Sequence, residues 1–207
     1  ATLNACEESG LPVVQCYGMT ETCSQFVALS AEEAPYHLGS VGKPLFTTQL
    51  RLVGEHHEIE IQTPALTPGY LNQPAKFASK HDGDWYRTGD VGHFDEDGFL
   101  YVDGRLDEMI ISGGENIFPT EVENVLRQYP GIQEIAVVGR NDQQWGAVPV
   151  AVVVSKQPVD FQQLEAFGRE HLAHYKVPKV YLQTDALPKN ASGKVQKFRL
   201  QDLVANA

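Results

Sequence analysis

Thr20 and Glu21 are the first residues whose side chains and position together could serve a chemical site. They follow the apolar run at residues 12–17 and a turn at Gly18, and the run is typical of a short buried strand. Polar residues at the carboxyl end of such a strand commonly face a ligand-binding crevice. The structural alternative is that the Thr20 hydroxyl caps the helix that follows.

Lys194 is a candidate phosphate-binding cation near the other end of the chain. It follows Gly193, but a phosphate-binding loop also requires a glycine five residues before that one, and position 188 is Pro. What remains is a lysine on the glycine-containing segment 190–193, from which it could reach outward as a point charge. A solvated surface lysine is the alternative.

The segment 103–119 combines charged residues, an apolar middle and the glycine pair Gly113-Gly114. Adjacent glycines adopt backbone conformations closed to other residues, or allow the backbone to approach a ligand closely. Arg105 and Asp107 follow a strand-like run and suit a solvent-facing hinge between two folded blocks. The alternative is an ordinary turn with charged side chains on its surface.

Composition and charge exclude some classes of protein. Of the 207 residues, 42% are hydrophobic and 21% are charged, which is typical of a folded chain. The formal net charge of -11 argues against a nucleic-acid-binding protein. After residue 168, however, seven Lys and Arg residues accompany three acidic ones. This basic excess would suit phosphates that are held locally, or an ordinary solvated helix face.

Cysteine usage and hydropathy indicate a cytoplasmic protein. Cys6, Cys16 and Cys23 form no CxxC pair, which is typical of reduced thiols. No apolar run approaches the length of about 18 residues that a membrane span needs, and no signal-peptide pattern is present. His56 and His57 are adjacent and have no spaced partner, so we expect no metal site there.

Four sequence blocks, in order, resemble motifs of the adenylate-forming superfamily, which contains acyl- and aryl-CoA ligases, luciferases and adenylation domains of nonribosomal peptide synthesis. The blocks are Tyr17-Gly18-Met19-Thr20-Glu21-Thr22, Tyr86-Arg87-Thr88-Gly89-Asp90, residues 104–123 (GRLDEMIISGGENIFPTEVE) and residues 187–194 (LPKNASGK). The resemblance covers nearly the whole chain. The family's Gly/Ser/Thr-rich phosphate loop lies upstream of the first block and is not found here. We therefore interpret the chain as the C-terminal part of a longer enzyme, with about half of the expected active site.

The resemblance implies a nucleotide site in the first part of the chain. By analogy with the family, Tyr17 packs on the adenine, Thr20 contacts the AMP phosphate, and Glu21 helps to hold magnesium. Asp90 would accept hydrogen bonds from both ribose hydroxyls, and a turn-forming aspartate is the alternative at this position. Three further residues are expected to contact the nucleotide: Gly18, Met19 and Arg105.

The resemblance also implies a mobile lid that begins at the hinge residue Asp107. Lys194 would bridge the attacking carboxylate and the α-phosphate of ATP during adenylation. The lid would then rotate about Asp107 and bring the hairpin of Gly113 and Gly114 to the pantetheine arm of coenzyme A. Trp145 would contact the nucleotide end of coenzyme A, or else seal the core of the lid.

Within the superfamily, the blocks indicate an AMP-forming acid–CoA ligase. The string DEMIISGGENI resembles CoA ligases, and residues 16–25, 38–45 and 190–192 look most like the bacterial o-succinylbenzoate–CoA ligases of menaquinone biosynthesis. The implied ligands are a carboxylic acid, ATP or AMP, Mg²⁺ and coenzyme A, and the implied partner is the N-terminal part of the same enzyme. The isolated chain is expected to be inactive. Alternatives are a medium-chain fatty or aryl acid–CoA ligase, or a non-catalytic fragment, and a homodimer is also open.

The surrounding residues predict the elements that position these blocks. Residues 49–53 and 58–62 alternate apolar and polar side chains, as in a hairpin of half-buried strands. The family's hairpin has a shorter loop, and a glycine where His57 lies. Residues 95–98 predict a second hairpin turn, and residues 3–9 a helix that ends at Gly10.

After the hinge, Thr120 and Glu123 predict a capping box at the start of a helix whose buried face carries Val122 and Leu126. Further strands are expected at residues 135–138, 148–154 and 180–183, and further helices at 161–172 and 198–204. The predicted fold class is α+β. Residues 1–105 would form the end of the large AMP-binding domain, including a β-rich, barrel-like subdomain, and residues 106–207 a small α+β lid domain.

Overall fold

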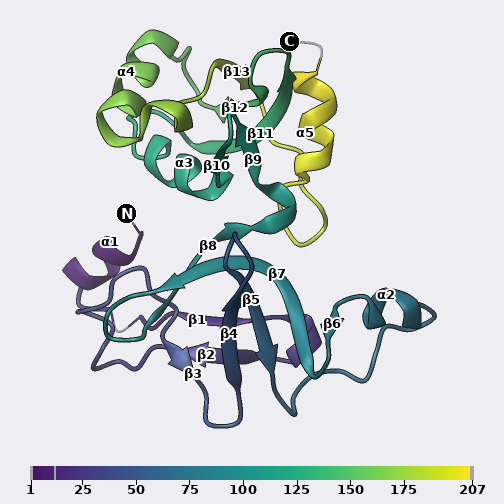
Figure 1. Ribbon diagram of the computed structural model, residues 1–207. Helices are drawn as coiled ribbons and strands as arrows, with labels where there is room; N and C mark the ends of the chain where they lie inside the picture. The colour runs from purple at the N-terminus through teal and green to yellow at the C-terminus, as the bar shows by residue number, and fades with distance from the viewer. Residues whose placement is uncertain (1, 12, 206–207) are drawn as a thin grey trace. The chain divides into compact units, whose positions relative to one another are not determined.

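The computed structural model describes residues 2–11 and 13–205 and divides the chain into two compact units (Figure 1). The first unit is Ala1–Leu106 and the second is Asp107–Ala207. The division falls within the segment 105–107 in which we placed the hinge. No helix of residues 2–11 and 13–205 has both the length and the apolar composition needed to cross a bilayer.

The first unit is built from two antiparallel sheets that share one core. One sheet contains β1 (Cys16–Gly18), β2 (Gln25–Ala28) and β3 (Lys43–Pro44). The other contains β4 (Gln49–Val53), β5 (Glu58–Gln62), β6 (His81–Asp82), β7 (Trp85–Phe94) and β8 (Leu100–Arg105). The helix α1 (Thr2–Glu8) precedes β1, and the connections between strands contain the 3₁₀ helix η1 (Thr20–Thr22) and α2 (Pro74–Ala78). The core is formed by Phe26, Val27, Ile59, Ile61, Tyr86 and Leu100.

The predicted hairpin of β4 and β5 is confirmed, with Gln49 opposite Gln62 and Val53 opposite Glu58. His57 lies in its turn with a φ of 57°, which is the left-handed region that favours glycine. The backbone of His57 is therefore strained at a position where the family's pattern has a glycine. The predicted turn at residues 95–98 is also present, and Asp95 Oδ1 accepts hydrogen bonds from the backbone N–H groups of Asp97 and Phe99.

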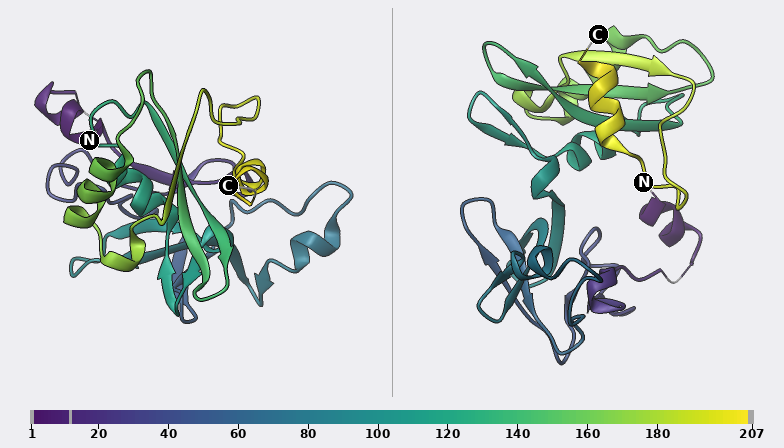
Figure 2. Two further views of the ribbon diagram at one scale, coloured as in Figure 1. Left: turned by 90° about the horizontal axis from the view of Figure 1, so that it is seen from above. Right: turned by 90° about the vertical axis from the view of Figure 1, so that its right-hand side faces the viewer.

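The second unit is a five-stranded sheet with helices on both faces (Figures 1 and 2). Its strands are β9 (Ile110–Ser112), β10 (Glu115–Ile117), β11 (Glu134–Asp142), β12 (Gly146–Val154) and β13 (Val180–Thr184). Its helices are α3 (Pro119–Leu126), α4 (Phe161–His171) and α5 (Lys197–Val204), with 3₁₀ helices η2 (Leu106–Glu108) and η3 (His174–Lys176). The predicted order of hairpin, helix, two strands, helix, strand and terminal helix is confirmed.

The apolar strands β11 and β12 are buried on both faces, which explains their nearly continuous hydrophobic sequences. On one face, Val137 packs in a core with Leu126 of α3 and Leu164 of α4. On the other, Val138 packs with Leu200 of α5. The α+β fold class is thus confirmed, and both cores of this unit depend on the same two strands.

The predicted capping box at the start of α3 is wrong. The helix begins at Pro119, and Phe118 precedes it without any side-chain cap. Proline presets a helical φ and lacks the N–H group that a cap would satisfy, so the helix starts one residue before Thr120 and places this threonine inside the first turn. Glu123 instead accepts a hydrogen bond from the backbone N of Val137 on β11, at 2.8 Å.

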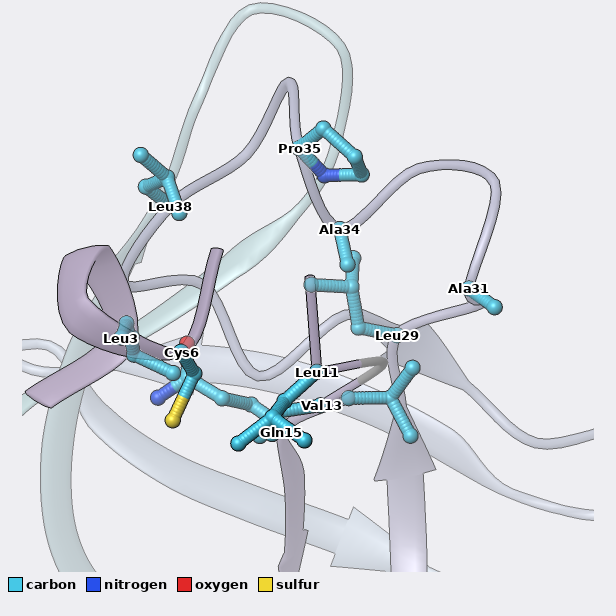
Figure 3. Close-up of a pocket in the computed structure, with 11 residues that line it drawn as sticks. Leu3, Cys6, Leu11, Val13, Gln15, Leu29, Ala31, Ala34, Pro35 and Leu38 are labelled. Atoms are coloured by element: carbon cyan, nitrogen blue, oxygen red, sulfur yellow. The ribbon is translucent and has the colours of Figure 1, made fainter. Parts of the chain in front are cut away.

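The predicted buried strand at residues 12–17 is largely wrong. The strand β1 contains only Cys16–Gly18, and Leu11, Val13 and Val14 are 58%, 44% and 47% exposed; residue 12 lies outside the described residues. These side chains line an apolar pocket together with α1 and the segment 29–38 (Figure 3). An apolar run becomes a buried strand only where other elements cover it fully, and here α1 and the segment 29–38 cover these side chains only in part.

Glu60 is a fully buried carboxylate in the second sheet of the first unit. Its neighbours across the ladder are Arg51 on β4 and Arg87 on β7, with N–O distances of 2.6 and 3.2 Å. Arg51 also lies over the ring of Trp85, 4.4 Å from its centroid. The two guanidinium groups compensate the buried negative charge and join three strands.

Replacing Glu60 by Ala should lower the free energy of unfolding of the first unit by about 1–3 kcal/mol, because two charge-assisted hydrogen bonds are lost while the two partly exposed arginines remain hydrated. The measurement is urea unfolding followed by Trp85 fluorescence in a Trp145→Phe background. The matched control is Glu55→Ala in the exposed hairpin turn, with an expected change within about 0.5 kcal/mol. Equal stability of the two variants would contradict a structural role for this ion cluster.

Candidate functional site

Three predicted site residues of the first unit are in direct contact. The Tyr17 hydroxyl donates a hydrogen bond to Oδ2 of Asp90 at 2.5 Å, and Nη1 of Arg105 donates to Oδ1 at 3.0 Å. Asp90 and Arg105 are opposite each other in the ladder of β7 and β8, whereas Tyr17 comes from β1 in the other sheet. The fold thus assembles one cluster from segments that are 73 residues apart in sequence.

Burial and charge set the protonation state of Tyr17. Burial is the main cause that raises the pKa of the Tyr17 phenol, and the negative charge of Asp90 raises this pKa further. The phenol therefore stays protonated near neutral pH and acts as a donor. A carboxylate has about four acceptor positions. The two hydrogen bonds to Asp90 are therefore compatible with its binding a pair of ribose hydroxyls as well.

Glu21 lies in η1 and is held by a tyrosine that the sequence analysis did not identify. The Tyr70 hydroxyl donates to Oε1 of Glu21 at 2.5 Å and lies 3.0 Å from the hydroxyl of Tyr86. Burial is the main cause that raises the pKa of both phenols, so both remain protonated. Pro68-Gly69 marks a turn directly before Tyr70, but a turn does not indicate which distant residue the tyrosine contacts.

The surroundings of Glu21 are compatible with magnesium bound together with a nucleotide. Within the described part of the chain, no three His, Cys, Asp or Glu side chains are grouped so that they could hold a metal ion. Mg²⁺ usually keeps several waters and is bound through one or two carboxylates plus substrate phosphates. A single carboxylate at Glu21 fits this donor set, and no metal cage made by these residues alone is required.

The other residues of this block have separate structural roles. Thr20 is exposed at the start of η1, and the residue at the N-cap is Met19, so the alternative in which Thr20 caps a helix is wrong. A Cβ at Gly18 would overlap the backbone of Ser24, which explains the glycine without a ligand. The side chain of Met19 packs against the core of the first unit. The nucleotide contacts of these residues stay predictions.

Lys194 lies on a tight turn of the second unit, and its side chain is exposed. Asn190 organises the turn: its Oδ1 accepts hydrogen bonds from the backbone N atoms of Ser192 and Lys194, at 3.1 and 2.9 Å. The backbone N of Asn190 donates to the carbonyl of Lys194 at 2.9 Å. The lysine backbone is therefore held on both sides, while its ammonium group extends from the surface.

The glycine pair forms the turn between β9 and β10, with φ values of 62° for Gly113 and 89° for Gly114. Trp145 lies beside it, and its carbonyl accepts a hydrogen bond from the Gly113 N at 2.9 Å. The Trp145 side chain packs on Gly113 and is 46% exposed, so the alternative that it seals the core is wrong. Gly114 borders open space, because nothing lies within 4 Å of a Cβ built there.

A β-rich unit with a clustered tyrosine, aspartate and arginine, followed by an α+β unit with an exposed lysine turn, is the arrangement expected of adenylate-forming enzymes. The chain matches the AMP-binding enzyme family over residues 1–71 and the AMP-binding enzyme C-terminal domain over residues 121–194. It belongs to this family.

Within this family, the chain is similar to 2-succinylbenzoate–CoA ligases. The chain is 48% identical to the 2-succinylbenzoate–CoA ligase of Bacillus licheniformis, over 96% of this chain and 43% of that protein. It is 42% identical to the o-succinylbenzoate CoA synthetase of Bacillus subtilis in complex with the acyl-adenylate intermediate, with a TM-score of 0.91 over 99% of this chain and 43% of that one. The complex of that synthetase with ATP and magnesium ion gives a TM-score of 0.90 at 42% identity, over 97% and 43% of the two chains. The chain thus spans less than half the length of these relatives.

Replacing Gly113 by Ala should destabilise the second unit by about 1–3 kcal/mol, because the residue has a left-handed backbone. Its Cβ would also lie 2.8 Å from Cε3 of Trp145, so the emission maximum of Trp145 should shift. The matched control, Gly114→Ala, carries the same kind of backbone strain without the clash, and should leave the emission unchanged. Thermal unfolding and fluorescence spectra measure both effects, and identical spectra for the two variants would contradict the packing of Trp145 on Gly113.

Proposed function

We propose that this chain is the C-terminal part of an AMP-forming acid–CoA ligase that converts 2-succinylbenzoate, ATP and coenzyme A into 2-succinylbenzoyl-CoA for menaquinone biosynthesis. The observation that carries the proposal is the cluster of Tyr17, Asp90 and Arg105, which offers an aromatic face and a carboxylate to a nucleoside. The substrate is inferred from relatives, 42–48% identical to this chain, that are named 2-succinylbenzoate–CoA ligase. The three free cysteines are consistent with a cytoplasmic location.

In the first half-reaction, a carboxylate oxygen of the acid forms a bond with the α-phosphorus of ATP, and pyrophosphate leaves. Asp90 orients the ribose, Tyr17 packs on the adenine, and Thr20 donates to the α-phosphate. Two anions meet in this step, so the exposed ammonium of Lys194 would stabilise the charge that builds between them. Magnesium at Glu21 would neutralise the phosphates further.

In the second half-reaction, the sulfur of coenzyme A loses its proton and forms a bond with the acyl carbon, and AMP leaves. Lys194 has no role at the sulfur. The turn at Gly113 and Gly114 would instead border the pantetheine arm, because Gly114 has no side chain and faces open space. Asp107 is exposed in η2, where the two compact units meet in sequence, and this position suits a hinge.

Complementation tests the proposal directly. The chain is co-expressed with the N-terminal part of the Bacillus licheniformis ligase, and pyrophosphate release is measured with 2-succinylbenzoate, a medium-chain fatty acid or an aryl acid. We expect release that depends on 2-succinylbenzoate and on both chain parts. Pyrophosphate release with a fatty or aryl acid, but not with 2-succinylbenzoate, would show that the substrate is a different acid. A folded complex that releases no pyrophosphate with any of the acids would favour a non-catalytic module.

Replacing Lys194 by Ala in the complemented enzyme should slow acyl-adenylate formation by about 10²–10³-fold, by analogy with single electrostatic stabilisers. Thioester formation from supplied acyl-adenylate should be largely retained, because that step does not need the cation. Single-turnover assays of the two half-reactions separate these effects. Equal losses in both half-reactions would remove the role assigned to Lys194.

Replacing Gly114 by Leu should have the reverse effect, with adenylation retained and thioester formation slowed, because the side chain would fill the path of the pantetheine arm. The matched control is Gly131→Leu, which imposes similar backbone strain at a φ of 91° on a loop outside the proposed path. Normal thioester formation by the Gly114 variant would contradict the proposed channel.

A further inference from the structure

Lys197 is the centre of an ion cluster that the proposed reaction does not use. It is the first residue of α5, and its Nζ lies 2.8 Å from Oε2 of Glu108 and 2.9 Å from Oε1 of Glu123. Glu108 belongs to η2 and is the second residue of the second unit, and Glu123 belongs to α3. One ammonium group therefore joins the entry of the unit, an internal helix and the start of its last helix.

This cluster differs from the exposed ion pairs of the same unit. The side chains of Lys197, Glu108 and Glu123 are 18%, 27% and 13% exposed, whereas those of Arg169 and Glu165 are 49% and 39% exposed. Exposed pairs contribute little because water and salt screen them. Breaking a buried pair leaves a charge without compensation and has a larger effect.

Both ends of the cluster are held by the body of the unit. Glu123 accepts a hydrogen bond from the backbone N of Val137, which fixes its carboxylate against β11. Lys197 begins a helix whose Leu200 and Val204 are buried against the sheet. Glu123 and Lys197 are therefore anchored to the sheet and to α5. Through Lys197 they hold Glu108, and with it the first residues of the second unit, in place.

The cluster also lies at the end of the turn that carries Lys194. Only two residues separate Lys194 from Lys197, and the backbone N of the intervening Gln196 donates to the carbonyl of Pro188 at 2.8 Å. Asp107, Glu108, Lys194 and Lys197 line one surface pocket of the second unit. The lysine turn and the entry segment are thus neighbours within this unit, and the ion cluster joins them.

We propose that Lys197 is a positioning residue, which fixes the turn of Lys194 relative to the segment at Asp107–Glu108 through its ion pairs with Glu108 and Glu123. The catalytic consequence of this role rests on the proposed ligase function. The coupling between the Lys194 turn and the entry segment rests only on the ion pairs and hydrogen bonds described above. Because the ammonium of Lys197 is already shared by two carboxylates, it supplies orientation, and the exposed Lys194 supplies the charge for the substrate.

The coupling is tested first in the 207-residue chain, without any activity, by hydrogen exchange. In Lys197→Met, the amides of Gly193, Lys194 and Gln196 should exchange about tenfold faster, since the turn loses its anchor. The same amides should respond in Glu108→Gln, although that substitution lies more than 80 positions away in sequence. Unchanged exchange at these amides in both variants would overturn the proposal.

Lys176→Met is the matched control. Lys176 of η3 pairs at 2.6 Å with Glu121, which lies on α3 as Glu123 does. Its side chain is 19% exposed, so the control removes a lysine that is about as buried as Lys197 but is not part of the Lys197 ion cluster. Exchange in the turn should stay as in the parent chain. Equal acceleration in the Lys176 and Lys197 variants would indicate a general loosening of the unit and would also overturn the proposal.

The catalytic consequence is measured in the complemented enzyme. Lys197→Met should lower kcat of acyl-adenylate formation roughly 10–100-fold, because the catalytic cation is misplaced, while the KM for ATP stays within about twofold. Lys197→Arg should restore most of kcat, since a guanidinium can pair with both carboxylates. A large rise in the KM for ATP without any change in kcat would show that Lys197 contacts the nucleotide, and would overturn the positioning role.

The two proposals fail in different ways. If the complemented parent enzyme activates no acid, the ligase function fails, yet the exchange experiment still decides the coupling. If the parent is active and Lys197→Met is as active as Lys176→Met, the positioning role fails and the ligase function stands.

Discussion

The pairing of Asp90 with Arg105 across β7 and β8 is the interaction on which the candidate nucleotide site depends. The ladder contains an irregularity between Val91 and Gly92, and this sets the register that places the two residues opposite each other. A Cβ at Gly92 would overlap the carbonyl of Tyr101, so the close approach requires glycine. A register shift by one residue would turn both side chains to the other face of the sheet.

The candidate site residues Asp90 and Lys194 differ in how far they are buried. In the first unit, Asp90 is buried and paired with Arg105, which suits the candidate nucleotide site because such a site requires fixed donors and acceptors. The second unit exposes Lys194 and fixes its backbone through Asn190. In the proposed reaction, Lys194 acts through its exposed side chain, and its position would be set by the backbone of the turn and, as proposed above, by Lys197.

The glycine turn at residues 113–114 and the lysine turn at residues 190–194 are built in the same way, with a fixed base and an exposed tip. Gly113 is covered by Trp145, which fixes the base of the β9–β10 turn, whereas its neighbour Gly114 faces open space. Asn190 similarly fixes the base of the turn from which Lys194 extends. In both turns, hydrogen bonds or side-chain packing at the base hold one exposed candidate residue, so the base and the tip of each turn have separate structural roles.

The sequence alone determined the elements with strong local patterns. The hairpin of β4 and β5, the double-faced strands β11 and β12, and the helices α4 and α5 follow from alternation, β-branched runs and helical spacing, which are local properties. The ordered motif blocks also identified the family and the candidate residues Asp90, Arg105 and Lys194.

The tertiary structure decided what depends on partners from distant segments. The apolar run at residues 12–17 was predicted to be buried, but Val13 and Val14 are exposed, since burial requires a covering element that local sequence does not specify. The hold of Tyr70 on Glu21 and of Lys197 on Glu108 joins residues 49 and 89 positions apart. Such contacts arise from strand order and helix packing, so no local pattern could have indicated them.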